Sequence, residues 1–237
     1  PSNSSAASDV YKRQSANKGE TVAFIGSTGS GKSTLVNLIP RFFDVTEGRI
    51  LVDGVDIRQM PLHELRERIG YVPQKGVLFS GTIDSNIRYG KEAATEAEVQ
   101  RAAEIAQAWD FIEEKEDGVQ SAIAQGGTNV SGGQKQRLSI ARAIAKNPEI
   151  YIFDDSFSAL DYKTDVVLRR ALKKETKDAT TLIVAQRIST ILHADKILVL
   201  DEGHVVGQGT HKELLKSCDV YRQIAMSQLS EEELADE

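Results

Sequence analysis

The 237-residue chain carries 29 Lys and Arg against 35 Asp and Glu, which gives a net charge of −6. This acidic balance without a basic stripe argues against nucleic acid as a partner. A single cysteine, Cys218, excludes an internal disulfide framework and fits a reducing compartment. The longest apolar runs have only the length of a strand, below the roughly 20 residues that span a bilayer. Any attachment to a membrane is therefore expected to come from another segment or another chain.

The two ends of the chain are expected to lie outside the folded domain. Residues 1–14 begin with small polar residues and continue into Ser-Asp-Val-Tyr-Lys-Arg-Gln, which resembles the translation of an adapter used in DNA sequencing libraries. We interpret residues 1–14 as disordered or as an adapter-derived artefact, in which case the natural protein continues upstream. Residues 230–237 are interpreted as a solvated acidic tail.

Strand-like and helical segments alternate along the chain, which predicts an α/β fold with a parallel or mixed sheet. The strand candidates are residues 21–25, 49–52, 69–72, 150–154, 181–185, 196–200 and 204–209. Residues 35–39 begin a helix that Pro40 ends. Between about residues 81 and 146 the strand pattern is lost, and capping boxes at 95–98 and 131–134 open helical runs over 99–108 and 135–146. We interpret residues 81–146 as a helical lobe inserted into a domain of residues 15–229.

The most specific chemistry lies in a glycine-rich loop between the first predicted strand and the helix after it. It fits the pattern G-x-x-x-x-G-K-[ST] and comprises Gly26, Ser27, Thr28, Gly29, Ser30, Gly31, Lys32, Ser33 and Thr34. Glycines let backbone N–H groups turn towards a phosphate, and the helix N-terminus adds positive potential. Lys32 supplies a charge for the β- and γ-phosphates, and the Ser33 hydroxyl is a ligand for Mg²⁺. The chain is therefore predicted to bind a nucleoside triphosphate.

Two carboxylates follow the apolar strand 150–154, at the edge where ligands bind in open α/β sheets. Alone, Asp154 and Asp155 would fit a solvated acidic turn equally well. Beside the phosphate loop, we interpret Asp154 as a Mg²⁺ ligand opposite Ser33, and Asp155 as the base or the group that orients water at the γ-phosphate.

The helix that begins at Ser131-Gly132-Gly133-Gln134 has a glycine-flanked N-terminus. Its structural interpretation is a well-capped helix with an apolar ridge. Its functional interpretation is a set of N–H groups that face an anion. Both interpretations fit these residues in isolation.

Together these motifs resemble the ATP-binding cassette (ABC) family of ATPases. The phosphate loop, Tyr71-Val-Pro-Gln74, Ser131–Gln134 and the paired carboxylates follow in the family's order, and Val130 departs from the first position of the LSGGQ signature. The resemblance covers about residues 15–229 and implies a P-loop NTPase core, with a mixed sheet flanked by helices and an inserted helical signature lobe. It also implies ATP and Mg²⁺ as cofactors.

The resemblance further assigns roles in binding. Gln74 would be a ligand of Mg²⁺ and water at the hinge of the lobe. Two cassettes of this family enclose two ATP molecules. The residues that would serve the partner's nucleotide in trans are Ser131, Gly132, Gly133, Gln134 and, in the D-loop, Asp161.

Three segments most resemble the exporter branch, namely residues 41–44, 48–54 and 77–87. In that branch the cassette follows a transmembrane domain in the same polypeptide, and a truncation upstream would explain why this domain is missing here. The resemblance places the cassette at the cytoplasmic face of the plasma (inner) membrane. The residues that specify the transported substrate would lie in the membrane domain.

Two catalytic positions depart from the family pattern. Asp155 stands where the family usually has Glu, and Gln186 stands where it usually has His. The shorter carboxylate is withdrawn by over an ångström, and a misplacement on the order of 1 Å costs ~10²-fold in rate. A Gln amide donates a hydrogen bond but carries no charge and shuttles no proton. Together these two departures predict a slow site, as in the degenerate-site subunit of a heterodimeric exporter whose partner carries Glu and His. The resemblance also counts Gln74 among the catalytic residues.

Other features are less decisive. Gln125, near the expected contact with the membrane domain, departs from an acidic residue often found there. Tyr11 is the only candidate to stack on adenine, and we expect the true stacking residue to be lost with the truncation.

A non-hydrolytic ATP-sensing module and the ATPase of an importer remain alternatives. A soluble ABC ATPase of DNA repair or translation would need a coiled-coil insertion or a second cassette, and the sequence shows neither.

Overall fold

The computed structural model describes residues 13–229 of the chain. Tyr11, most of the predicted N-terminal artefact and the acidic tail 230–237 lie outside the described residues. Arg13 and Gln14, the end of the predicted artefact, are exposed and have no regular structure. The described chain divides into two compact units, one formed by residues up to Pro61 together with those from Thr180 onwards, the other by Leu62–Ala179.

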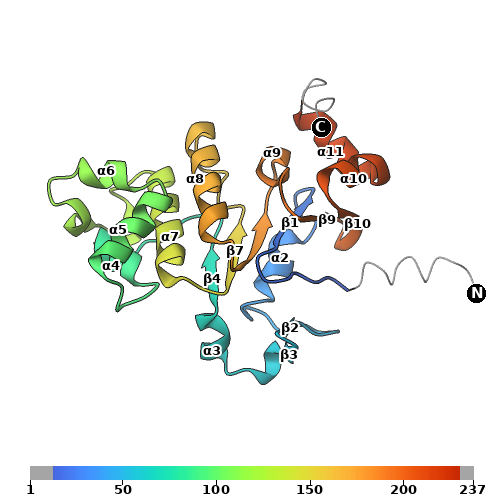
Figure 1. Cartoon of the computed structure of the whole chain (residues 1–237), viewed down its shortest axis with the longest axis horizontal. Helices are drawn as coiled ribbons and strands as arrows, with labels where there is room; N and C mark the ends of the chain where they lie inside the picture. Colours follow the sequence, from blue (N-terminus) through green and yellow to red (C-terminus); the bar gives the residue numbers. More distant parts are fainter. Residues whose placement is uncertain (1–12, 230–237) are drawn as a thin grey trace, which may run out of the picture. The chain divides into compact units, whose positions relative to one another are not determined.

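The first unit is built on a mixed sheet with the strand order β10-β9-β1-β8. Figure 1 labels three of these strands, namely β10, β9 and β1. The central strand β1 runs parallel to both β8 and β9, whereas β10 pairs antiparallel with β9. The bounds are β1 Thr21–Gly26, β8 Thr180–Val184, β9 Lys196–Asp201 and β10 His204–Gly209. Every residue from Val22 to Ile25 is buried, as expected for a parallel strand that is covered on both faces.

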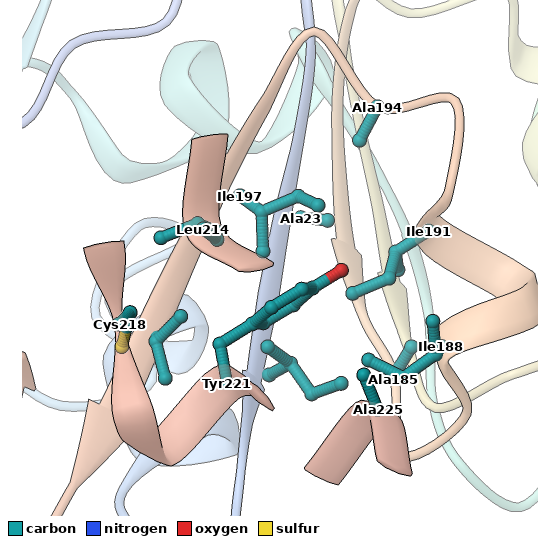
Figure 2. Close-up of a cluster of buried hydrophobic side chains, with 12 residues drawn as sticks. Ala23, Ala185, Ile188, Ile191, Ala194, Ile197, Leu214, Cys218, Tyr221 and Ala225 are labelled. Atoms are coloured by element: carbon teal, nitrogen blue, oxygen red, sulfur yellow. The ribbon is translucent and has the colours of Figure 1, made fainter. Parts of the chain in front are cut away.

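Helices flank this sheet because its strands are apolar on both sides. Ala23 and Ile25 of β1 belong to a core cluster with side chains of α9, α10 and α11 (Figure 2). Successive residues of a strand point to opposite faces, so the equally buried Val22 and Phe24 face the other side. The helices are α2 Lys32–Asn37, α9 Ile188–Ile191, α10 His211–Ser217 and α11 Asp219–Gln228.

Leu214 is the core residue of α10, and its side chain is 0 % exposed. Leu214→Ala is expected to lower the free energy of unfolding by about 2–5 kcal/mol, because it removes buried methyl groups and leaves a cavity. Urea denaturation of the full chain measures this loss. Met226→Ala on neighbouring α11 is the control, since Met226 is 63 % exposed and should change the free energy by no more than about 0.5 kcal/mol. An equal loss of unfolding free energy in the two variants would contradict the burial of Leu214 in the core.

The second unit combines a parallel strand pair with helices. β4 (Ile69–Val72) pairs in parallel with β7 (Ile150–Asp154). Its helices are α3 Leu62–Glu67, α4 Ile83–Arg88, α5 Glu96–Ile105, α6 Trp109–Glu113, α7 Gly132–Lys146 and α8 Tyr162–Glu175. Capping boxes at Thr95 and Ser131 begin α5 and α7, so the two helix starts predicted from these motifs are confirmed.

Two details differ from the predicted elements. The region 81–146 is not free of strands, because β5 (Gly81–Thr82) pairs antiparallel with β6 (Ala122–Ile123). The predicted strand 49–52 contributes only β2 (Leu51–Val52), which pairs with β3 (Val55–Asp56) in a sheet of its own. Strands of two residues are too short to show a hydrophobic period.

The predicted α/β class with a mixed sheet flanked by helices is confirmed. Within residues 13–229 no helix has both the length and the apolar character needed to cross a membrane.

Candidate functional site

The glycine-rich loop of the first unit joins the end of β1 to the start of α2. Gly26 ends the strand at a point where a Cβ atom would lie 2.1 Å from the backbone oxygen of Leu200, so only glycine fits there. Gly31 precedes α2 with φ of 95°, a left-handed conformation that glycine adopts without strain. The N-terminus of α2 has no side-chain cap. The loop therefore wraps closely around the helix start and presents backbone groups there.

Lys32 is held inside this loop, with only 8 % of its surface exposed. Its Nζ donates to the backbone oxygens of Gly26 at 2.7 Å and Ser27 at 2.8 Å, and to Ser30 Oγ at 3.3 Å. These three acceptors fix an ammonium group at the mouth of the loop. Ser33 and Thr34, the next two residues, are exposed at the start of α2. A fixed positive charge beside helix N–H groups suits a phosphate chain.

Gln186 lies in the same unit, two residues after the end of β8. Because β8 pairs in parallel with β1, Gln186 and the glycine-rich loop both follow the carboxyl ends of neighbouring strands. The side chain of Gln228 holds this turn: its Nε2 donates to the Gln186 oxygen and its Oε1 accepts from the Ile188 N–H, both at 2.8 Å. The exposed Gln186 is therefore carried by a well-supported turn at the phosphate-loop edge of the sheet.

The second unit brings Gln74, Asp154 and Asp155 together. Gln74 Nε2 donates to Asp155 Oδ2 at 2.9 Å, so these two predicted site residues are in direct contact. Asp154 ends β7 and Asp155 follows it, and both are buried. Asp155 has φ of 49°, a left-handed conformation that Asp adopts more readily than most other residues.

Tyr71 is a neighbour of Asp154 that sequence reasoning missed. It lies on β4 opposite Ile152 of β7, and its hydroxyl donates to Asp154 Oδ2 at 3.1 Å. Burial, and next the charge of Asp154, raise the pKa of the Tyr71 phenol, so it keeps its proton as a hydrogen-bond donor. The signal that could have found it is the parallel pairing of β4 with β7, which aligns the ends of the two strands.

These oxygen-bearing groups fit Mg²⁺. The part of the chain that the structure describes holds no group of three or more His, Cys, Asp or Glu side chains arranged for a metal. Mg²⁺ is usually held by one or two carboxylates together with substrate phosphates and water rather than by a protein cage. A single oriented carboxylate such as that of Asp154 satisfies this requirement.

The signature segment forms the N-terminus of α7, also in the second unit. Ser131 Oγ accepts from the Gln134 N–H at 3.2 Å, and Gln134 Oε1 accepts from the Ser131 N–H at 3.0 Å. This capping box engages the amides of Ser131 and Gln134, so those of Gly132 and Gly133 are the first-turn donors that it does not use.

Asp161 has a structural role that the sequence analysis did not assign. Its two carboxylate oxygens accept from the N–H of Thr164 at 3.0 Å and from its hydroxyl at 2.7 Å, so Asp161 caps α8. The hydrogen bond from the Thr164 side chain, followed by that from its backbone, lowers the pKa of Asp161 and keeps the cap ionised.

A family model described as ABC transporter matches residues 13–158. The chain belongs to the ABC transporter family. An uncharacterised ABC transporter ATP-binding protein of Mycobacterium tuberculosis is 50% identical over 216 residues, which are 90% of this chain and 37% of the relative. A protein of Staphylococcus aureus, described by its name as a multidrug export ATP-binding/permease protein, is 51% identical over 207 residues, 87% of this chain and 36% of the relative.

Among solved structures, a bacterial Atm1-family ABC exporter with ATP bound superimposes with a TM-score of 0.87 at 42% identity, covering 91% of this chain and 38% of the exporter. The chain thus spans little more than a third of the length of the curated relatives it matches. It is an ABC transporter ATP-binding domain, an ATPase of the class coupled to transport, and its homologues include exporters.

Tyr71→Phe tests the contact with Asp154 in this ABC domain. With Asp154 as the Mg²⁺ ligand expected from the sequence, the variant should weaken the apparent Mg²⁺ affinity in ATP binding by about 10-fold, since loss of an outer partner of a metal ligand typically costs 10–100-fold. A Mg²⁺ titration of ATP binding measures the change. Tyr151→Phe is the matched control, because Tyr151 is a buried tyrosine of the neighbouring strand β7. A shift that is equal in both variants would show that Tyr71 has no specific role.

Proposed function

We propose that this chain is the ATP-binding and ATP-hydrolysing domain of an ABC exporter, and that pairing with a second cassette drives transport. The exporter assignment is carried by the identity of 51% with a protein described as a multidrug export ATP-binding/permease protein. It is supported by the likeness to an Atm1-family exporter. Importer ATPases lack such support among these relatives.

ATP is bound through its phosphates by residues 26–34. Lys32 exchanges its three loop acceptors for β- and γ-phosphate oxygens, and the amides at the start of α2 add further donors. Ser33, Gln74 and Asp154 are the proposed ligands of Mg²⁺, which supplies charge neutralisation at the phosphates when bound. Tyr71 orients the Asp154 carboxylate.

The proposed catalytic residues are Asp155, Gln186 and Gln74. Asp155 orients the attacking water, Gln186 donates to a γ-phosphate oxygen, and Gln74 ties the Asp155 carboxylate in place through its 2.9 Å hydrogen bond. A carboxylate that is short and already engaged by Gln74 is poorly placed to reach water. We infer that the chain hydrolyses ATP slowly at its own site.

The signature segment serves a partner. The first-turn amides of Gly132 and Gly133, together with Ser131 and Gln134, are proposed to contact the γ-phosphate side of an ATP held by the second cassette. Asp161, whose ionised carboxylate caps α8, is proposed to serve that site from the D-loop by facing the second cassette. In a heterodimer this partner carries Glu and His at the two altered positions and performs most of the turnover. The capping box supports this role, because it fixes the helix end and leaves two donors for an anion.

A transmembrane domain is the second proposed partner, at the cytoplasmic face of the plasma (inner) membrane. The surface proposed to contact it contains the rings of Phe79 and Tyr89, whose centroids lie 4.6 Å apart at an interplanar angle of 38°. Both side chains are exposed, with Tyr89 69 % exposed. Arg142 lies over both rings and donates to the backbone oxygens of Asn86 and Val77. Exposed aromatic side chains held in fixed positions are typical of an interaction surface.

The test compares ATP turnover by the full chain and by its Asp155→Glu, Gln186→His variant, each mixed with a cassette that carries Glu and His. Faster turnover by the variant pair supports hydrolysis limited by these two residues. A chain that binds ATP but shows no turnover in any combination would instead be a non-hydrolytic ATP-sensing module.

A further inference from the structure

The segment 73–76, which contains Gln74, is attached to helix α7 by a buried side chain, that of Gln136. Its Nε2 donates to the Pro73 oxygen at 3.0 Å, and its Oε1 accepts from the Gly76 N–H at 2.8 Å. The two contacts lie on either side of Gln74. The side-chain amide of Gln136 therefore satisfies one backbone acceptor and one backbone donor of the loop, as the backbone of a neighbouring strand would.

A glutamine is required at this position. Gln136 is only 1 % exposed, so a backbone group that loses its partner here finds little water to replace it. A carboxylate of the same length would accept from Gly76 but could not donate to the Pro73 oxygen. Pro73 itself has no N–H, which leaves its carbonyl as the group that needs a donor.

Gly76 brings the loop into contact with the helix backbone. A Cβ atom at this position would lie 2.7 Å from the Lys135 oxygen and 2.9 Å from Ser139 Oγ, both on α7. Carbon atoms do not approach a backbone oxygen this closely, so any side chain at residue 76 would push the loop away from the helix. The attachment thus depends on the buried amide of Gln136 on the helix and on the absence of a side chain at Gly76 in the loop.

The attachment connects two functional segments of the same unit. At its loop end, Gln74 donates to Asp155. At its helix end, Gln136 stands five residues after Ser131, about 7.5 Å along the helix axis at 1.5 Å per residue. A displacement of the signature helix is therefore transmitted to the Gln74 loop through a short, buried and hydrogen-bonded connection.

We propose that Gln136 is a positioning residue, which makes the Gln74 loop and the signature helix move as one body. This inference rests on the proposed function, since Gln74 and Ser131 receive their roles in ATP binding there. The signature helix that serves the partner's nucleotide then sets the position of Gln74 at the chain's own nucleotide. Residues 73–76 thereby couple the site that holds the partner's nucleotide to the site that holds the chain's own nucleotide.

Gln136→Met and Gly76→Ala test this proposal from opposite sides of the contact. Met has a similar length but neither donates nor accepts, whereas the new methyl group at residue 76 acts by collision. A nitroxide label on Lys75→Cys in the full chain reports loop motion, and buried Cys218 does not compete for the label. Both variants are expected to increase label mobility and to weaken the apparent Mg²⁺ affinity in ATP binding by about 10-fold.

Thr176→Val is the matched control, because it removes a different buried hydrogen bond of the second unit, from Thr176 Oγ1 to the Leu172 oxygen. It should change neither readout. Unchanged label mobility or unchanged Mg²⁺ affinity in both variants, in a chain that binds ATP, would overturn the proposal alone. Failure of the unaltered chain to bind ATP would instead overturn the proposed function together with this inference.

Discussion

Replacing Lys32 by alanine is expected to lower the affinity of the chain for ATP on the order of 10²-fold. A charge-assisted hydrogen bond contributes about 1.5–3 kcal/mol, and about 1.4 kcal/mol corresponds to a factor of ten in affinity. Lys32 is held at the loop by acceptors at 2.7 and 2.8 Å, so its ammonium group already lies within the loop before the phosphates arrive. Isothermal titration with ATP and Mg²⁺ measures the loss.

Lys32→Arg separates charge from geometry. The guanidinium group keeps the positive charge but is planar and larger than an ammonium group, and it replaces a side chain that is almost fully buried between two carbonyls. We expect Lys32→Arg to lower the affinity for ATP nearly as much as Lys32→Ala. Lys212→Ala, an exposed residue of α10, controls for a general loss of positive charge. An affinity for ATP that survives in Lys32→Ala would contradict the assignment of the phosphate loop.

The phosphate loop could be predicted from sequence because its chemistry is local. A strand, a fixed set of glycines, one lysine and a helix start occupy consecutive positions, and β1 and α2 confirm this order. The capping boxes at Thr95 and Ser131 are local in the same sense. The same pattern at Thr210 and Glu213 begins α10, so the start of that helix is also encoded locally.

The contacts around the carboxylates could not be predicted in this way. Tyr71 and Asp154 are 83 positions apart in the sequence, and Gln74 and Asp155 are 81 apart. Their contact depends on the parallel register of β4 with β7, in which Tyr71 pairs with Ile152. Hydrophobic pattern predicts that both strands exist, but it does not specify which strands are neighbours or how they are aligned.

The role of Gln136 likewise could not be predicted from the sequence. In the sequence it is an ordinary polar residue of an amphipathic helix. In the structure it is buried, and its amide satisfies two backbone groups of another segment. Because buried polar groups are retained only when they are hydrogen-bonded, burial distinguishes such a residue from the exposed glutamines.

The altered catalytic positions acquire a physical explanation from these contacts. The Asp155 carboxylate accepts from Gln74 at 2.9 Å, and its backbone lies in the left-handed region. Asp155 is one methylene shorter than the Glu of the family pattern, so its carboxylate reaches less far from the backbone. We therefore expect the proposed slow hydrolysis to arise from the short reach of the carboxylate at residue 155 and from the missing positive charge at residue 186.

Asp155→Glu combined with Gln186→His is expected to raise the rate of ATP hydrolysis by about 10²-fold, the factor associated with correcting a misplacement on the order of 1 Å. The measurement is single-turnover hydrolysis in mixtures of the unaltered chain and the variant, because in the proposed function each site needs a signature segment from a second chain. Each single variant should recover only part of the gain. Glu at a left-handed position is expected to lower the free energy of unfolding by about 1 kcal/mol, which urea denaturation detects separately. An unchanged rate in a variant that folds and binds ATP would show that Asp155 and Gln186 do not limit hydrolysis, and would contradict the proposed degenerate site.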